Sequence, residues 1–298
     1  MSVAARLGHI FDAPAVRNAV LKECADDLAI AEEIMVVAML FAARHGDQTM
    51  FERLIEELPT LSLRMASQTI SLFGHYSGRV LAERAAALIE ARATTSEEVT
   101  RLAHAASIGM LYIYEMDFGF GGALVDSPPH AGMVRWAQLV DVWSDHTDLN
   151  DTQRIDVLTS AAALGSNRAR NRIDEIIKSI DPDDPRYGIG DEVRQVLSAA
   201  VGEAQRHALL PLAVAMRFAR AKDFNVASRG VTAIAAHADR AALDMLLALH
   251  AETTEWHLRG EIERAVETLS TQLGVFIERN GEALKVGSRG ASAESPGT

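Results

Sequence analysis

Residues His237–Leu269 read HADRAALDMLLALHAETTEWHLRGEIERAVETL and contain two helical patterns in succession. Apolar residues recur every three or four positions over Asp239–His250, which predicts an amphipathic helix. A second helix is predicted downstream by the apolar stripe Ile262, Val266, Leu269 and Leu273. The block therefore predicts two consecutive amphipathic helices joined by a short turn.

Helical patterns of the same kind run through the rest of the chain. Phe51, Leu54, Ile55 and Leu58 form one such stripe, and Thr95 with Glu98 three residues later forms a capping box before another. No stretch of the sequence alternates apolar and polar residues over the length of a strand. We therefore predict an all-α protein of about thirteen helices, each roughly 10–18 residues long.

One helical pattern recurs at similar intervals along the chain. It consists of an aliphatic residue, a variable residue and further apolar positions that end in a small residue or glycine, as in VRQVLSAAVG at Val193–Gly202. Generic helical periodicity does not fix the distance between helices, so this spacing indicates an array of helical hairpins. The second positions of the seven copies are Met35, Arg64, Thr100, Asp156, Arg194, Ala227 and Arg259.

The block His237–Leu269 resembles HEAT repeats, in which an acid precedes an aliphatic–arginine pair on the first helix of each unit. Glu255 precedes Leu258-Arg259 in this way, and Asp191 precedes Val193-Arg194. The resemblance covers most of 31–272 and concerns a repeat class; Thr100, Asp156 and Ala227 depart from it because they replace the arginine. It implies a right-handed array of antiparallel helical hairpins, a HEAT-like α-solenoid. A compact multi-helix bundle is the alternative.

The repeat spacing also predicts how the chain is organised. Thr100 and Asp156 lie 56 residues apart where other copies lie 29 to 38 apart, so about 20 residues are extra. We predict a single repeat domain over 1–279, with units at roughly 31–110 and 150–279 and an insertion at about 112–135. Residues 280–298 contain only two large aliphatic residues, Leu284 and Val286, and are predicted to be a disordered tail.

Composition and charge restrict the class of protein. Apolar residues make up 48% of the sequence and the net charge is −12, which disfavours nucleic acid as the main partner. No apolar run reaches the roughly 20 residues of a membrane helix, and no secretory signal is recognisable. The single cysteine, Cys24, fits a reducing compartment, so we expect a cytoplasmic protein, and the 25 Arg against 4 Lys suggest a bacterial source.

Motif searches favour a non-enzymatic protein. The sequence contains no phosphate-binding loop, zinc-protease motif, serine-nucleophile motif or cysteine cluster, so we assign no catalytic residue, metal or cofactor. The acidic loops Asp141–Asp151 and Asp181–Glu192 lack EF-hand spacing and are interpreted as helix caps and solvated turns. The triplet Asp117–Gly119 has none of the other kinase motifs around it.

The expected function is therefore a protein–protein interaction or scaffold module, binding through one face of the helical array. The expected contact residues come from the aromatic segment and an arginine-rich stretch, and they are Tyr112, Tyr114, Phe118, Phe120, Trp136, Arg217, Arg220 and Arg229. The aromatic residues have a second interpretation, in which they fill the joint between two groups of repeats.

Two other functions stay open from the sequence. HEAT-like folds also include DNA glycosylases and bilin lyases, so an enzyme or ligand-binding protein is one alternative. Trp136, Trp143 and Asp141 would be the residues of a glycosylase-like site. The other alternative is a bacterial immunity-type protein that neutralises a basic partner through its acidic surface.

Overall fold

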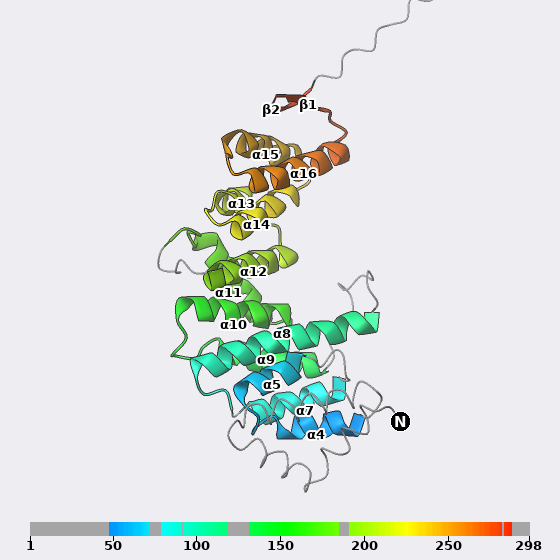
Figure 1. Cartoon of the computed structure of the whole chain (residues 1–298), viewed down its shortest axis with the longest axis vertical. Helices are drawn as coiled ribbons and strands as arrows, with labels where there is room; N and C mark the ends of the chain where they lie inside the picture. Colours follow the sequence, from blue (N-terminus) through cyan, green and yellow to red (C-terminus); the bar gives the residue numbers. More distant parts are fainter. Residues whose placement is uncertain are drawn as a thin grey trace, which may run out of the picture. The chain divides into compact units, whose positions relative to one another are not determined.

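The computed structural model describes residues 48–71, 79–90, 92–118, 131–184, 191–281 and 283–287, and these are mostly helical (Figure 1). The all-α prediction is confirmed for this part of the chain, apart from one short strand pair. Contacts divide the chain into two compact units, Met1–Arg172 and Ile173–Thr298. The prediction of one repeat domain over 1–279, and the choice between a HEAT-like array and a bundle, stay predictions.

Unit 1 is built from helices whose apolar faces form a shared core. α5 packs against α8, α7 packs against α9, and α10 contacts both α8 and α9. The described helices of this unit are α4 (Gln48–Glu57), α5 (Leu63–Ser71), α7 (Arg79–Ile89), α8 (Ser96–Phe118), α9 (Ala131–Trp143) and α10 (Asp151–Ala163). α11 (Asn167–Ser179) begins in unit 1 and crosses the boundary between the units.

The insertion predicted at about 112–135 is partly regular helix. α8 continues without interruption to Phe118, and α9 begins at Ala131. Residues 119–130 lie outside the described part of the chain, as do the expected helices in 1–47 and Cys24.

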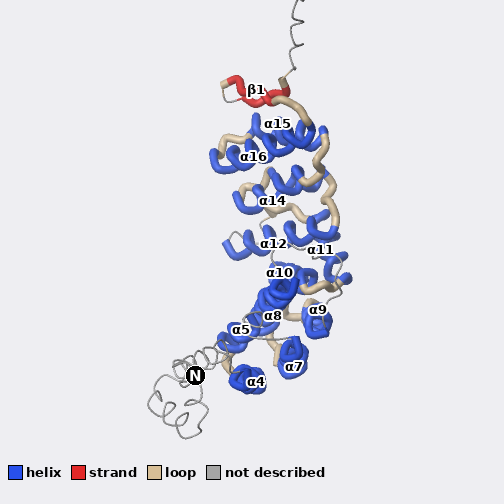
Figure 2. Tube along the Cα trace, turned by 90° about the vertical axis from the view of Figure 1, so that its right-hand side faces the viewer, coloured by secondary structure: helices blue, strands red, loops and turns tan. Residues whose placement is uncertain are grey.

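Unit 2 contains two rows of helices. α12 contacts α14, and α14 contacts α16, so these three form one row (Figure 2), while α13 and α15 pack on α14 and α16 from the other side. A ring contact at 5.9 Å between Phe224 and His257 places the N-terminal ends of α14 and α16 side by side, so these two helices run parallel. Their bounds are α12 (Asp191–His207), α13 (Leu212–Ala219), α14 (Phe224–Ala235), α15 (Arg240–Glu252) and α16 (Trp256–Leu273).

Acidic side chains begin the last three of the described helices. Asp223 accepts a hydrogen bond from the Val226 amide at the start of α14, and Asp239 does the same for Ala242 at the start of α15. Glu255 accepts from two amides at the start of α16. A carboxylate at this position satisfies free N–H groups and lies at the positive end of the helix dipole, so these residues fix where each helix begins.

A hairpin of two short strands follows α16 and corrects the prediction of a tail starting at 280. β1 (Ile277–Asn280) pairs antiparallel with β2 (Ala283–Val286), and β2 contacts α15. Leu284 and Val286, the two aliphatic residues of the expected tail, are half-buried and alternate with exposed Lys285. Alternation of this kind lets a strand bury one face on a neighbouring helix, so two aliphatic residues are enough to order the strand. Residues 288–298 lie outside the described part.

Two glycines allow helices to approach more closely than any side chain would permit. A Cβ at Gly230 of α14 would lie 2.1 Å from the Ala219 nitrogen at the end of α13. A Cβ at Gly109 of α8 would lie 2.0 Å from the Ile70 carbonyl oxygen in α5. The obstacles are backbone atoms, so the helices themselves would have to move apart.

We predict that Gly230→Ala lowers the free energy of unfolding by about 1–3 kcal/mol, because the added methyl group forces α13 away from α14. Gly260→Ala is the matched control: Gly260 also lies within a helix, and no atom lies within 4 Å of the place that an added methyl group would take. Alanine there should leave stability unchanged or raise it by up to about 1 kcal/mol. Urea unfolding measures the change in the free energy of unfolding for each variant. Equal changes would contradict the close approach of α13 to α14 at Gly230.

Candidate functional site

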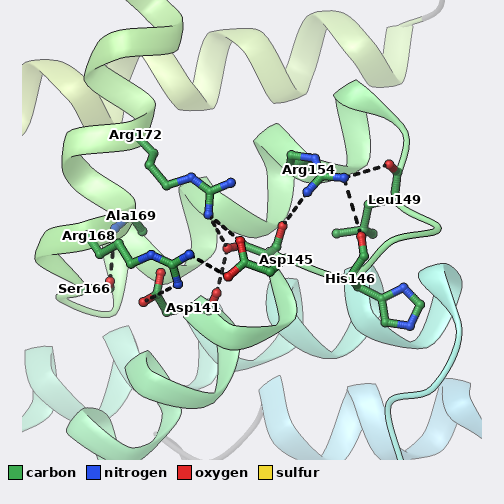
Figure 3. Close-up of polar contacts among 10 residues, drawn as sticks. Asp141, Asp145, His146, Leu149, Arg154, Ser166, Arg168, Ala169 and Arg172 are labelled. Carbon is green, nitrogen blue, oxygen red and sulfur yellow. Dashed lines mark hydrogen bonds and ion pairs between the residues drawn. The ribbon is translucent and has the colours of Figure 1, made fainter.

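Unit 1 contains a network of arginines around the turn that follows α9. Figure 3 shows the guanidinium groups of Arg168 and Arg172, both on α11, directed at the carboxylate of Asp145. Nη2 of Arg168 lies 2.5 Å from Oδ2 of Asp145, and Nη1 of Arg172 lies 2.9 Å from Oδ1. The hydrogen bond from Arg168 lowers the pKa of Asp145, and the bond from Arg172 lowers it further, against the opposing effect of desolvation.

Arg154, on the first turn of α10, holds the same turn through its backbone. Its guanidinium donates to the carbonyl oxygens of Ser144, His146 and Leu149 at 3.0, 3.5 and 3.3 Å. These carbonyls follow the end of α9 and have no partner within a helix, although the His146 oxygen also accepts from the Leu149 amide, so Arg154 supplies hydrogen bonds that a helix would otherwise provide. With Asp145 bound by two arginines, this network organises the turn.

Unit 2 uses an arginine in the same way. Arg217, on α13, is half-buried, and its Nη2 donates to the carbonyl oxygens of Ile177 and Lys178 at 2.8 and 3.0 Å, at the end of α11. The contacts of Nη2 are with the end of a neighbouring helix, and the predicted role of Arg217 in partner binding stays a prediction. Arg217 is a positioning residue.

Further contacts connect the turns at the same end of unit 2. The Lys222 amide donates to Oδ1 of Asp183 at 3.0 Å, and Arg220 pairs with Glu252 at 2.8 Å. These contacts, with the Phe224–His257 ring contact, bring three turns together. We call this surface the turn edge and define it as residues 180–184, 220–225 and 252–257.

Exposed aromatic side chains lie on the turn edge. Phe224 and Trp256 are the first residues of α14 and α16, and they are 39% and 72% exposed. The ring of His257 contacts both, with its centroid 3.3 Å from that of Trp256 and 5.9 Å from that of Phe224. Large aromatic groups that remain in water beside polar turns are typical of protein-binding surfaces.

The acidic caps leave their charge at the turn edge. Glu255 accepts hydrogen bonds from the amides of Leu258 and His257, and the bond from Leu258 is the main cause of its lowered pKa. Asp223, which caps α14, lies 3.7 Å from Arg194 of α12. The two carboxylates directly precede the exposed rings in the sequence, Asp223 before Phe224 and Glu255 before Trp256.

A second polar cluster in unit 2 attaches the C-terminal hairpin. Glu263 of α16 contacts Nε2 of the buried His250 at 3.0 Å and also pairs with Arg279 of β1. The hydrogen bond with His250 is the main cause of the lowered pKa of Glu263, with Arg279 contributing. The cluster connects α15, α16 and β1, and this explains the position of the hairpin.

The structure assigns other roles to several residues predicted to bind a partner. Trp136 is fully buried and its Nε1 donates to the Ala82 carbonyl at 2.8 Å, so it is a core residue, which corrects the prediction of a surface contact. Tyr112, Tyr114 and Phe118 belong to α8, but their side chains are not among those described, and Phe120 lies outside the described residues. The aromatic-anchor prediction for these four stays a prediction.

Arg220 and Arg229 are exposed, as a binding residue must be. Arg220 pairs with Glu252, and Nε of Arg229 lies 3.4 Å from the Ser198 hydroxyl on α12. Both also connect neighbouring helices of unit 2. Their predicted role in partner binding is not decided by these contacts.

The residues of a glycosylase-like site do not form one. Trp136 and Trp143 are both buried and pack edge to face with centroids 6.4 Å apart, so neither ring is accessible to a flipped base. Asp141 of α9 lies 3.5 Å from Arg168. The two tryptophans are part of the unit 1 core.

Phe224 and Trp256 are not among the site residues predicted from the sequence. A pattern in the sequence nevertheless distinguishes them. Each aromatic residue directly follows an acidic cap, as Asp223-Phe224 and Glu255-Trp256, and the two pairs are 32 residues apart. That separation matches the repeat spacing. Aromatic residues at equivalent positions of successive repeats lie next to each other in an array, so they indicate a surface cluster.

The described residues offer neither a metal site nor a membrane-spanning helix. Within the described residues, no group of three or more His, Cys, Asp or Glu side chains is arranged to hold a metal ion. None of the described helices is both long and apolar enough to cross a membrane. No protein-family model, curated protein or solved structure matches the chain.

We predict that Arg154→Lys lowers the free energy of unfolding by about 1–3 kcal/mol, because a lysine keeps the charge but cannot reach three separate carbonyls. Arg84→Lys is the matched control, since Arg84 is exposed and pairs only with the exposed Glu56 among the contacts described. That change should cost less than about 0.5 kcal/mol. Chemical unfolding measures the free energy of unfolding of both variants. Equal losses in the two variants would contradict the role of Arg154.

Proposed function

We propose that the protein is a non-enzymatic protein–protein interaction module whose binding surface is the turn edge of unit 2. The observation that supports this most directly is the pair of exposed rings, Phe224 and Trp256, which both contact the ring of His257 at the starts of two neighbouring helices. Tryptophan is the residue most enriched among those that dominate binding energy at protein interfaces. Trp256 is exposed on a surface whose turns are held in place by Arg217 and by the helix caps. A partner would therefore meet an indole ring whose position is already fixed.

The HEAT-like arrangement of hairpins is the finer part of this proposal. It is supported by the row α12, α14 and α16, by the acidic caps that begin α14 and α16, and by the 32-residue separation of their aromatic residues. Arrays of this type bind partners along the surface formed by equivalent positions of successive repeats. The turn edge is such a surface.

The basic stretch 193–229 offers a less suitable binding surface. Arg194 lies near Asp223, Arg206 pairs with Glu203, and Arg220 pairs with Glu252. Arg217 donates to backbone carbonyls. Because most of these cations are engaged within unit 2, the exposed aromatic rings are the better candidates for a partner contact.

The test is site-specific photo-crosslinking in a lysate of cells that encode the protein. We expect a benzophenone amino acid placed at position 256 or 224 to form an adduct with a partner protein. Position 209 is the control, because Leu209 is 55% exposed but lies in the turn before α13, at the opposite end of that helix. The proposal fails if position 256 gives no adduct, or if position 209 gives the same adducts.

A further inference from the structure

We propose that the partner presents a cationic, arginine-bearing segment to the turn edge, with an arginine stacked on Trp256. This inference rests on the proposed function, since it identifies the chemistry of the partner at the same surface. It is carried by the charge around the exposed rings, by the internal pairing of the nearby cations, and by the accessible face of an indole.

The turn edge is acidic. It contains six carboxylates and two cations, Arg220 and Lys222, which gives a formal charge of −4 with His257 taken as neutral. Adding the neighbouring Arg194 leaves −3. The carboxylates come from three turns that the chain separates widely: Asp181, Asp183, Asp184, Asp223, Glu252 and Glu255.

The carboxylates are held close to the aromatic rings by the contacts between turns. Glu255 directly precedes Trp256, and Asp223 directly precedes Phe224. Asp183 is fixed beside them because its Oδ1 accepts the Lys222 amide. An anion at this surface would be repelled, whereas a cation above the indole gains both the attraction of the ring face and that of the carboxylates.

Arginine suits this surface better than lysine. A guanidinium group is planar, stacks on an indole, and donates to a carboxylate through two N–H groups at once. Its weaker hydration also makes it easier to transfer from water to an interface. The aliphatic part of the same side chain, or an apolar neighbour, could cover Phe224.

A second copy of the chain is a poorer occupant. It would bring the same acidic turn edge, on a protein of net charge −12, against itself. Like charges placed opposite each other at an interface oppose association. Self-association is therefore an outcome that would overturn the inference.

The experiment uses the full chain and a labelled ten-residue peptide of alternating arginine and glycine, with fluorescence anisotropy as the readout. Peptides with lysine or glutamate in place of arginine are compared. We expect saturable binding of the arginine peptide, weaker binding of the lysine peptide, and none of the glutamate peptide. Affinity should fall as salt rises from about 50 to 300 mM, because the interaction is largely electrostatic.

Variants separate the turn edge from the general acidity of the chain. Trp256→Ala should weaken binding of the arginine peptide roughly tenfold. The variant loses both the stacking of an arginine on the indole and the contact area that the indole buries when the peptide binds. The double variant Asp183→Asn with Glu255→Gln removes two charges but keeps the hydrogen-bond acceptors, and it should also weaken binding. Its matched control is Asp244→Asn with Glu267→Gln, which removes two charges from exposed residues within α15 and α16. Circular dichroism checks that all variants remain folded.

The inference is overturned if Trp256→Ala binds the arginine peptide as well as wild type does, or if both double variants weaken binding equally. It is also overturned if the glutamate peptide binds, or if sedimentation shows that the turn edge pairs with a second copy. These results are distinguishable from failure of the proposed function: an adduct at position 256 with no peptide binding leaves the interaction module standing and removes only the basic partner.

Discussion

Hydrogen bonds from arginine side chains to the carbonyl oxygens at helix ends are the interaction on which the arrangement of the turns depends. In unit 1, Arg92 donates to the carbonyls of Leu58 and Leu61, and Arg154 to three carbonyls after α9. In unit 2, Arg217 donates to two carbonyls at the end of α11. The last carbonyls of a helix have no partner within it, and a guanidinium with five donors can satisfy several of them from a neighbouring helix. The excess of arginine over lysine thus has a structural use.

The candidate site of unit 2 follows from this constraint. Because Arg217 holds the end of α11 against α13, the turn carrying Asp183 lies next to the turn carrying Lys222. The pairing of Arg220 with Glu252 continues the row to the next turn. Phe224 and Trp256 are the first residues after these turns, so the same contacts that align the helix ends bring both rings to the turn edge, where each directly follows an acidic cap. Binding would use a surface that folding has already assembled.

The sequence predicts helices well and the site poorly, for physical reasons. Apolar stripes such as Ile262, Val266 and Leu269 reflect burial directly, and all three are buried in α16. The sequence predicts a surface position for Trp136 because an aromatic ring can serve either a core or an interface, and only three-dimensional packing decides which. The hairpin formed by β1 and β2 was missed because two aliphatic residues order a strand only when α15 lies beneath them.

The most direct test of this account is hydrogen exchange of Arg217→Lys, with Arg240→Lys as the control because Arg240 makes an exposed ion pair with Asp244 along α15. The account predicts faster exchange at the amides of the turn edge, above all at Lys222 and in residues 181–184, while the amides in the middle of α15 and α16 keep their protection. The control should exchange as wild type does. Unchanged exchange in these turns, or an increase spread evenly over unit 2, would contradict the claim that the arginine aligns the helix ends.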